Sequence, residues 1–283
     1  MQPATDGGPV SYLSGPVARE IHIDRVDGVL RSIVAIGNDY RDGHRVKSHH
    51  HRRGQLISGA TGVIVLSTAE GTWVMPPQRG MWIPPATEHR VEMIGAVSVQ
   101  SLYIEPHAIS NLPSHCQVVG ISPFMRALVT EALSLPIEYE LEGRAGALMQ
   151  LIQYEMQQLP VLPLSLRYPA HGPLSARCRQ FVQEPNIHET IDAWADALGA
   201  SRRSFTRLFR RETGMSFVAW RQQACLLCAM PRLAAGEAVT TVAIDLGYEN
   251  PAAFTLMFRR AFGSSPLAYL GLRARSTRTL TLP

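Results

Sequence analysis

The fold of this chain is decided by the stretch Ala195-Asp196-Ala197-Leu198-Gly199 and by Phe205-Thr206-Arg207-Leu208-Phe209-Arg210-Arg211, which follows it. The first returns as Ala243-Ile244-Asp245-Leu246-Gly247, an offset of 243 − 195 = 48. The second returns as Phe254-Thr255-Leu256-Met257-Phe258-Arg259-Arg260, an offset of 254 − 205 = 49. Each copy predicts a short helix, a glycine turn and a second helix with an apolar inner face and arginines at its end. This pattern is a helix-turn-helix, and it occurs here twice.

The composition indicates a folded protein of two domains. Of the 283 residues, 46% are hydrophobic and 18% charged, and no apolar run reaches the roughly 18–20 residues that span a bilayer. The N-terminus lacks the basic-then-apolar order of a signal peptide, so we expect a cytoplasmic protein without a membrane partner. The four cysteines are too scattered for a disulfide framework. The Cys225-x-x-Cys228 pair lies among Ala and Leu residues and indicates helix packing rather than metal or redox chemistry.

The net charge of +4 is unevenly distributed along the chain. From residue 171 onward there are 14 Arg, no Lys and 8 acidic residues, which gives 14 − 8 = +6. Residues 1–170 carry 13 basic and 15 acidic residues, which gives 13 − 15 = −2. A basic C-terminal half beside a mildly acidic N-terminal half is typical of a nucleic-acid-binding module joined to a separate sensing module.

The N-terminal half predicts a small β-barrel or jelly roll. Short β-branched or aromatic runs, separated by Gly, Pro or charged turns, occur at 33–36, 62–66, 71–75, 80–83 and 97–104. Two amphipathic helices are then predicted at about 122–135 and 144–159. The apolar stripe of the second helix leaves two alternatives open, packing within the domain or a dimer seam. Trp73 and Trp82 are expected in the core or along a barrel cavity.

The C-terminal half predicts helices throughout, near 174–183, 190–198, 202–213, 217–235, 240–246, 251–262 and 266–271. Thr190, Ser201, Thr240 and Asn250 stand at helix starts as N-caps, and glycines stand where helices should stop. The expected organisation is a disordered tail at 1–16, a barrel domain at 17–160, a linker at 161–173, a tandem helix-turn-helix domain at 174–273 and a tail at 274–283.

The predicted helix 202–213 has a basic outer face. Phe205 and Phe209 point inward, and the outer positions are candidate DNA contacts: Arg202, Arg203, Thr206, Arg207, Arg210 and Arg211. In a major groove, Arg203, Thr206 and Arg207 would meet base edges, because Arg binds guanine bidentately and Thr offers a hydroxyl or a methyl group. Arg210 and Arg211 would meet phosphates. A solvated basic face is the alternative for one such helix, and the second copy favours duplex DNA.

The second such helix, 251–262, offers fewer side chains that could recognise bases. Its candidate contacts are Asn250, Ala252, Ala253, Thr255, Leu256, Arg259 and Arg260. There is no long polar side chain in the helix before Arg259, so we expect this helix to touch thymine methyl groups or mainly to hold the backbone. The first helix is therefore expected to carry more of the sequence discrimination.

Residues of about 174–273 resemble the DNA-binding domain of the AraC/XylS family of transcription regulators. The resemblance is carried by the repeat, by Leu208–Phe217, by Val242–Tyr248 and by Phe258 through Pro266. It implies two helix-turn-helix units joined by one long helix, about 217–235, that places both units in successive major grooves. Two departures affect that spacing: the family commonly carries Arg near the position of Cys225, and Pro231 lies inside the helix.

A histidine-rich loop marks the barrel. His49-x-His51 with the distant His89 resembles the metal motif of cupin barrels, with Gln55 where such enzymes often have Glu. The surrounding stretch also resembles the cupin-like sensing domains of one AraC-family branch. Two alternatives remain: a site for Zn²⁺, Ni²⁺ or Fe²⁺, or a pocket lined by uncharged histidines.

The sequence thus indicates an α+β protein with an N-terminal cupin-like barrel, accessory helices and an all-α C-terminal domain. Its expected function is that of a transcription regulator, not an enzyme, that binds specific double-stranded promoter DNA and responds to a small ligand through the barrel. A homodimer and contact with RNA polymerase are expected partners. The alternative is a metal-dependent cupin enzyme fused to a DNA-binding domain. RNA is disfavoured because no aromatic stacking platform is predicted.

Overall fold

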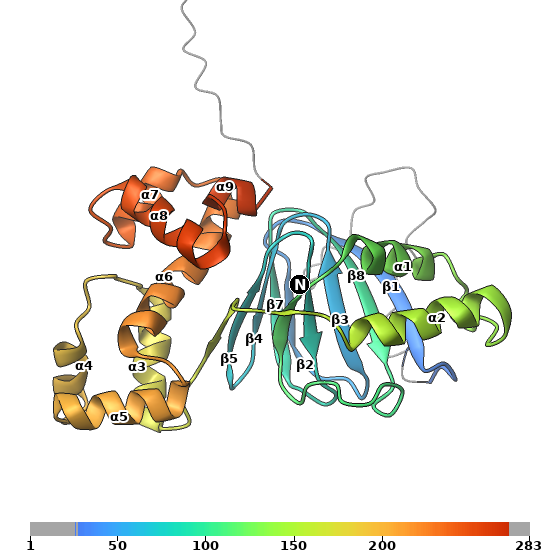
Figure 1. The fold of residues 1–283 in the computed structure, drawn as a ribbon, viewed down its shortest axis with the longest axis horizontal. Coiled ribbons are helices and arrows are strands. Elements are labelled where there is room, and N and C mark those ends of the chain that lie inside the picture. The colour runs from blue at the N-terminus through green and yellow to red at the C-terminus, as the bar shows by residue number, and fades with distance from the viewer. Residues whose placement is uncertain (1–25, 27, 272–283) are drawn as a thin grey trace, which may run out of the picture.

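The computed structural model describes residues 26 and 28–271, a β-rich domain followed by a helical one (Figure 1). The tails expected at 1–16 and 274–283 lie outside the described residues. The β-rich domain holds two antiparallel sheets, one in the order β1-β8-β3-β6-β9-β10 and one in the order β11-β5-β4-β7-β2. The strands are β1 (Ile33–Tyr40), β2 (Arg45–His49), β3 (Gly54–Gly59), β4 (Val63–Ser67), β5 (Gly71–Met75), β6 (Arg79–Ile83), β7 (His89–Ile94), β8 (Val97–Ile104), β9 (Gln117–Gly120), β10 (Val161–Leu162) and β11 (Ser165–Arg167).

Sequence reasoning missed β2, β3, β7 and β9. Strand β2 carries alternate charged side chains and is largely exposed, so it lacks the apolar signal of a strand. Strand β3 is buried along its whole length and therefore does not alternate. Its neighbours explain this, because β3 lies between β6 and β8 with Ile57 in the barrel core and Leu56 beneath the covering helices.

Two helices, α1 (Pro123–Leu133) and α2 (Gly143–Met156), cover the β1-β8-β3 side of the barrel (Figure 1). On α2, Ile152 and Met156 are buried in a cluster with β-sheet side chains and α1. Leu151 and Tyr154 are 38% and 66% exposed, respectively. Most of the predicted stripe therefore packs within the domain, and a second, narrower apolar face remains outside.

The segment expected to be a linker adds strands to both sheets. Strand β10 pairs with β9, and β11 pairs with β5. The reason is an alternation of leucines in this segment, since Leu164 and Leu166 are buried in the barrel core. The connection to the helical domain is consequently short, because α3 already begins at Gly172.

The helical domain follows the predicted boundaries closely. Its helices are α3 (Gly172–Gln183), α4 (Ile191–Ala197), α5 (Arg202–Thr213), α6 (Phe217–Ala234), α7 (Val239–Asp245), α8 (Pro251–Phe262) and α9 (Pro266–Tyr269). Thr190, Ser201 and Asn250 accept hydrogen bonds from backbone amides as N-caps. The expected cap Thr240 is wrong: α7 begins one residue earlier, its N-cap is Ala238, and that position has no side-chain cap.

The barrel rests on the central helix of the helical domain. Helix α6 packs against β4, β5 and β11, and apolar side chains of both domains join in one buried cluster. Gln223 on α6 donates a hydrogen bond to the carbonyl of Ser165 at 2.7 Å. Arg179 on α3 donates to the carbonyl of Ala69 at 2.6 Å, and its guanidinium lies 4.1 Å from the ring centre of Tyr168.

Candidate nucleic-acid interface and histidine site

The internal repeat forms two helix pairs of the same size. Helices α4 and α7 each have 7 residues, and α5 and α8 each have 12. The buried positions also correspond, because Trp194 and Ala195 return as Val242 and Ala243, and Phe205 and Phe209 return as Phe254 and Phe258. The one-residue difference between the two offsets lies in the turn, 198–201 against 246–250. Figure 1 shows the two units at opposite ends of α6.

An aromatic cluster holds α5 in place. The indole of Trp194 lies edge-on to Phe205 and Phe209 at ring-centre distances of 6.4 and 6.1 Å, and 5.0 Å from Phe217. The predicted inward positions of Phe205 and Phe209 are confirmed, since both are fully buried. The opposite side of α5 is therefore turned to solvent.

That solvent face of α5 carries three exposed arginines. Arg203, Arg207 and Arg210 are exposed, and their guanidinium groups make no hydrogen bond or ion pair with any other residue that the structure describes. The spacings of four and three residues place them on one side of the helix. Gly214 ends the helix in the left-handed conformation, with φ 73°, so the chain turns away directly after the arginines.

The other predicted contacts on α5 are already engaged. Arg202 pairs with Asp192 at 2.8 Å, and Arg211 pairs with Glu212 at 2.9 Å. The hydroxyl of Thr206 donates to the carbonyl of Arg202 at 2.7 Å. Both ion pairs have an arginine that is about two-thirds exposed, so each is weak in water and open to exchange.

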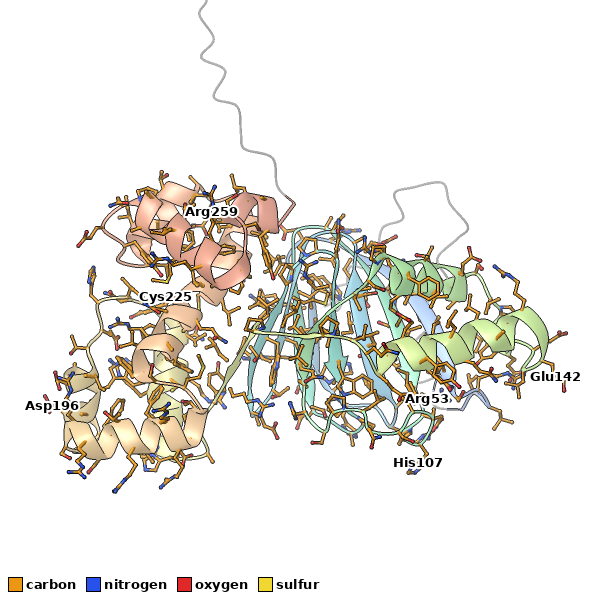
Figure 2. The ribbon with its side chains drawn as sticks, viewed as in Figure 1. Arg53, His107, Glu142, Asp196, Cys225 and Arg259 are labelled. Atoms are coloured by element: carbon orange, nitrogen blue, oxygen red, sulfur yellow. The ribbon has the colours of Figure 1, made fainter. Side chains whose placement is uncertain are left out.

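Helix α8 presents a flatter and more apolar surface. Ala252, Ala253 and Leu256 are exposed, and Leu256 has an exposed fraction of 51%. The side chain of Asn250 is engaged in capping, since it accepts from the amide of Ala253 at 2.8 Å. Thr255 is half-buried. The arginines come only in the last turn, where Arg259 and Arg260 are both exposed (Figure 2 labels Arg259).

The two departures on the central helix have different outcomes. Cys225 is fully buried between the two units, so the side chain at this position packs in the core (Figure 2). Burial raises the pKa of the Cys225 thiol, which makes it a poor nucleophile. Helix α6 continues through Pro231 to Ala234. Arg232 near its end pairs with both Glu237 and Asp245 at 2.5 Å, and this contact joins α6 to α7.

Three histidines converge in the barrel, as the sequence predicted. His49 ends β2 and lies opposite His89 at the start of β7, with ring centres 4.3 Å apart. His51, in the loop before β3, lies 5.3 Å from His89. One ring nitrogen of each histidine lies within 4.8 Å of those of the other two. His51 and His89 are almost fully buried, with 4% and 1% exposed.

The loop that carries His51 is anchored by ion pairs of the two arginines that follow it. Arg52 and Arg53 pair with Glu105 at 2.5 and 2.8 Å, and the hydrogen bond from Arg52 lowers the pKa of the Glu105 carboxyl. Burial, together with the neighbouring histidines, lowers the pKa of His89 to about 4, so this ring is neutral at pH 7. Its Nε2 atom is buried and has no hydrogen-bond partner among the described residues.

Gln55 joins this cluster through partners that sequence reasoning missed. Its Oε1 lies 3.0 Å from Nε2 of His51, and its amide nitrogen lies 3.0 Å from both the Ser101 and Tyr103 hydroxyls. The available signal was the alternation of β8, where Ser101 and Tyr103 face the same side as Gln55 of the adjacent strand. The two tryptophans are core residues: Trp73 and Trp82 are 1% and 3% exposed and donate to backbone carbonyls.

Comparisons with known proteins identify the family of each domain. Residues 32–132 match the model of an AraC-like ligand binding domain, and residues 194–271 match a helix-turn-helix domain. The HTH-type transcriptional regulator NimR of Escherichia coli (strain K12) is 32% identical over 222 residues, 78% of this chain and 81% of NimR. The uncharacterized HTH-type transcriptional regulator YobQ of Bacillus subtilis (strain 168) is 25% identical over 226 residues, 78% of this chain and 88% of YobQ.

A solved structure of the DNA-binding domain of AdpA in complex with a target DNA is 31% identical, covers 35% of this chain and 90% of that domain, and has a TM-score of 0.32. Among the described residues, no helix is long and apolar enough to cross a membrane. The family models occupy the barrel and the tandem helix pairs in turn, and the match to NimR spans both. The chain therefore belongs to the AraC family of transcription regulators, with an N-terminal ligand-binding barrel and a C-terminal helix-turn-helix domain that binds DNA.

Proposed function

We propose that this regulator reads duplex promoter DNA asymmetrically, with α5 discriminating bases and α8 mainly holding the duplex. The observation that carries the proposal is the contrast between the two exposed faces. Along α5 lie three exposed arginines that have no partner among the described residues, whereas α8 offers two alanines and a leucine before its terminal arginines. Arginine is the side chain that most often distinguishes guanine in the major groove, and alanine and leucine can contact only thymine methyl groups.

We infer that both helix pairs act on one DNA molecule. Helix α6, with 18 residues, is about 27 Å long at roughly 1.5 Å per residue, and the two units lie at its ends (Figure 1). One turn of B-DNA is about 34 Å. The distance between the two reader helices, α5 and α8, is the length of α6 plus part of the width of each unit. This distance allows α5 and α8 to enter successive major grooves. Arg210, Arg211, Arg259 and Arg260 are proposed to meet phosphates, with Arg202 released from Asp192 to join them.

The barrel is proposed to receive a small effector at the cluster His49, His51, Gln55 and His89. Its curated relatives are transcription regulators, which supports a sensing role rather than catalysis. The helix on which the barrel rests is also the helix that spaces the two readers. We further propose that the regulator forms a homodimer and acts in the cytoplasm. RNA polymerase is proposed as a further partner.

The base-reading role of α5 is tested with Arg207→Ala. A preferred operator is first selected from a random duplex library, and affinities are then measured for that operator and its single-base variants. We expect a loss of about 1–3 kcal/mol on the operator and relaxed preference at one base pair. Arg144→Ala is the matched control, because Arg144 is an exposed arginine on α2, far along the chain from both readers.

Equal weakening of Arg207→Ala on every duplex sequence would show that Arg207 touches only the backbone. Unchanged affinity would remove α5 from the interface altogether. A loss in Arg144→Ala of the same size would assign the effect to total charge rather than to position.

A further inference from the structure

We propose that the barrel binds one divalent transition-metal ion through the Nε2 atoms of His49, His51 and His89. The proposal deepens the sensing role given above by naming the class of ligand, and it rests on that role only for the place of the site. The three ligands come from β2, from the loop before β3 and from β7, so only the folded barrel brings them together.

The spacing of the rings suits a single ion. One ring nitrogen of each histidine lies within 4.8 Å of those of the other two. In a tetrahedral zinc site with Zn–N bonds of about 2.0–2.1 Å, ligand nitrogens are roughly 3.3 Å apart. Small side-chain rotations are therefore sufficient to close the rings around the ion. His49 keeps partial access to solvent, which leaves a route of entry.

Backbone carbonyls orient all three rings in the same way. Nδ1 of His49 lies 2.9 Å from the carbonyl oxygen of Lys47, Nδ1 of His51 lies 2.5 Å from that of Arg53, and Nδ1 of His89 lies 2.8 Å from that of Thr87. A carbonyl oxygen can only accept, so each Nδ1 carries the proton and donates it. Each Nε2 therefore offers a lone pair, and this outer hydrogen bond is the one that metal-binding histidines normally make.

The contact between His51 and Gln55 also indicates a cation. With the proton of His51 on Nδ1, its Nε2 faces Oε1 of Gln55 at 3.0 Å, and both atoms are acceptors. A metal ion between them converts this repulsion into two coordinate bonds. If the Gln55 amide is turned over, its NH₂ group donates to His51 and the cation is not needed. In that case Ser101 and Tyr103 would donate to Oε1, so the two arrangements predict different effects of substituting Gln55.

The donor set selects the class of ion. Three imidazole nitrogens and one amide oxygen, all neutral, suit Zn²⁺, Ni²⁺, Co²⁺ or Fe²⁺ rather than Ca²⁺ or Mg²⁺, which prefer several oxygen ligands. Since these four groups contribute no negative charge, the bound ion keeps its two positive charges. That uncompensated charge would favour an anionic donor atom as an additional or replacing ligand.

The experiment uses the full chain, purified without a polyhistidine tag and stripped with a chelator that is then removed. Binding of Zn²⁺ is measured by equilibrium dialysis with elemental analysis, and Co²⁺ is added separately as a spectroscopic probe. We expect one ion per chain and a visible Co²⁺ absorption band that Zn²⁺ abolishes. His89→Ala should weaken binding at least about 100-fold, beyond the 10–100-fold typical of losing an outer hydrogen bond.

His50→Ala is the matched control, because His50 is an exposed histidine in the same loop outside the cluster. If His89→Ala does not fold, Gln55→Glu still tests the metal site. A carboxylate in place of the amide at the fourth position should tighten Zn²⁺ binding by about 10-fold or more. Gln55→Leu should weaken it several-fold.

No uptake of Zn²⁺ or Co²⁺ by the wild-type chain would overturn the proposal. So would unchanged uptake in folded His89→Ala, or Gln55→Glu binding no more tightly than the wild type. Uptake lost equally in His50→Ala would point to a site on the exposed loop and would also overturn it. Because uptake is measured without DNA, failure of the proposed DNA reading does not affect these results.

Discussion

Gly54 shows how one residue without a side chain determines the packing of the barrel. It opens β3 directly beneath the indole of Trp82, and a methyl group on its α-carbon would lie 2.2 Å from the ring. The ring is held by a hydrogen bond from its Nε1 to the carbonyl of Pro113 at 2.8 Å. A side chain at this position would therefore have to displace the ring and break or bend that hydrogen bond.

We therefore predict that Gly54→Ala destabilises the barrel by about 1–3 kcal/mol, the usual effect of overpacking a core. Chemical denaturation of the full chain, followed by tryptophan fluorescence, measures it. Gly28→Ala is the control, since its added methyl group would meet no atom within 4 Å. Equal stability of the two variants would show that Trp82 can rearrange.

At the scale of elements, the two helix-turn-helix units have the same framework and different surfaces. The same inner positions are buried in both, and both reader helices end at a glycine in the left-handed conformation, Gly214 and Gly263. The solvent faces differ most in function, because Arg203 and Arg207 on α5 correspond to Ala252 and Leu256 on α8. The shared framework sets where the readers lie, and the surface residues set what each can contact.

This contrast predicts that Arg259→Ala weakens binding about equally on all duplex sequences. The slope of log K against the logarithm of the salt concentration should become shallower by about one, because one phosphate contact is lost. Fluorescence anisotropy over a range of salt concentrations measures both quantities, with Arg207→Ala as the comparison. A changed base preference in Arg259→Ala would contradict the assignment of α8 to the backbone.

At the scale of the whole molecule, the barrel has two different sides. One side rests on α6 through β4, β5 and β11, and the other is covered by α1 and α2 (Figure 1). The outer face of α2 carries Leu151 and Tyr154, which are three residues apart and point in a similar direction. A second copy of the chain is the proposed occupant of this face, in keeping with the expected homodimer.

We predict that Tyr154→Lys converts a dimer into a monomer, because the buried charge would remain unpaired at the seam. Light scattering after gel filtration measures the mass of the particle. Leu30→Lys is the control, since Leu30 is an isolated apolar residue on the surface, with 85% exposed. A wild-type monomer at all concentrations, or a Tyr154→Lys dimer, would exclude this seam.

Much of the helical domain could be predicted because its signals are local. Helix starts are set by caps three residues from their amide partners, as at Ser201 and Asn250, and inner faces by spacings of three and four. The expected cap Thr240 was wrong because α7 begins at Val239, after Ala238, without any side-chain cap. The barrel was harder: β3 is buried on both faces, and only its pairing with β6 and β8 reveals it.

By itself the sequence determined the tandem helix-turn-helix, the basic reader face and the presence of three candidate histidine ligands, since repeats and residue types are visible along the chain. Tertiary structure alone decided which ring nitrogens face one another, that Gln55 meets Ser101 and Tyr103, and that the barrel rests on α6. Contacts of this kind join residues far apart in the chain, such as His49 with His89 and Gln55 with Tyr103. No local pattern encodes such distances, because strand pairing and domain docking are set by the collective burial of apolar surface.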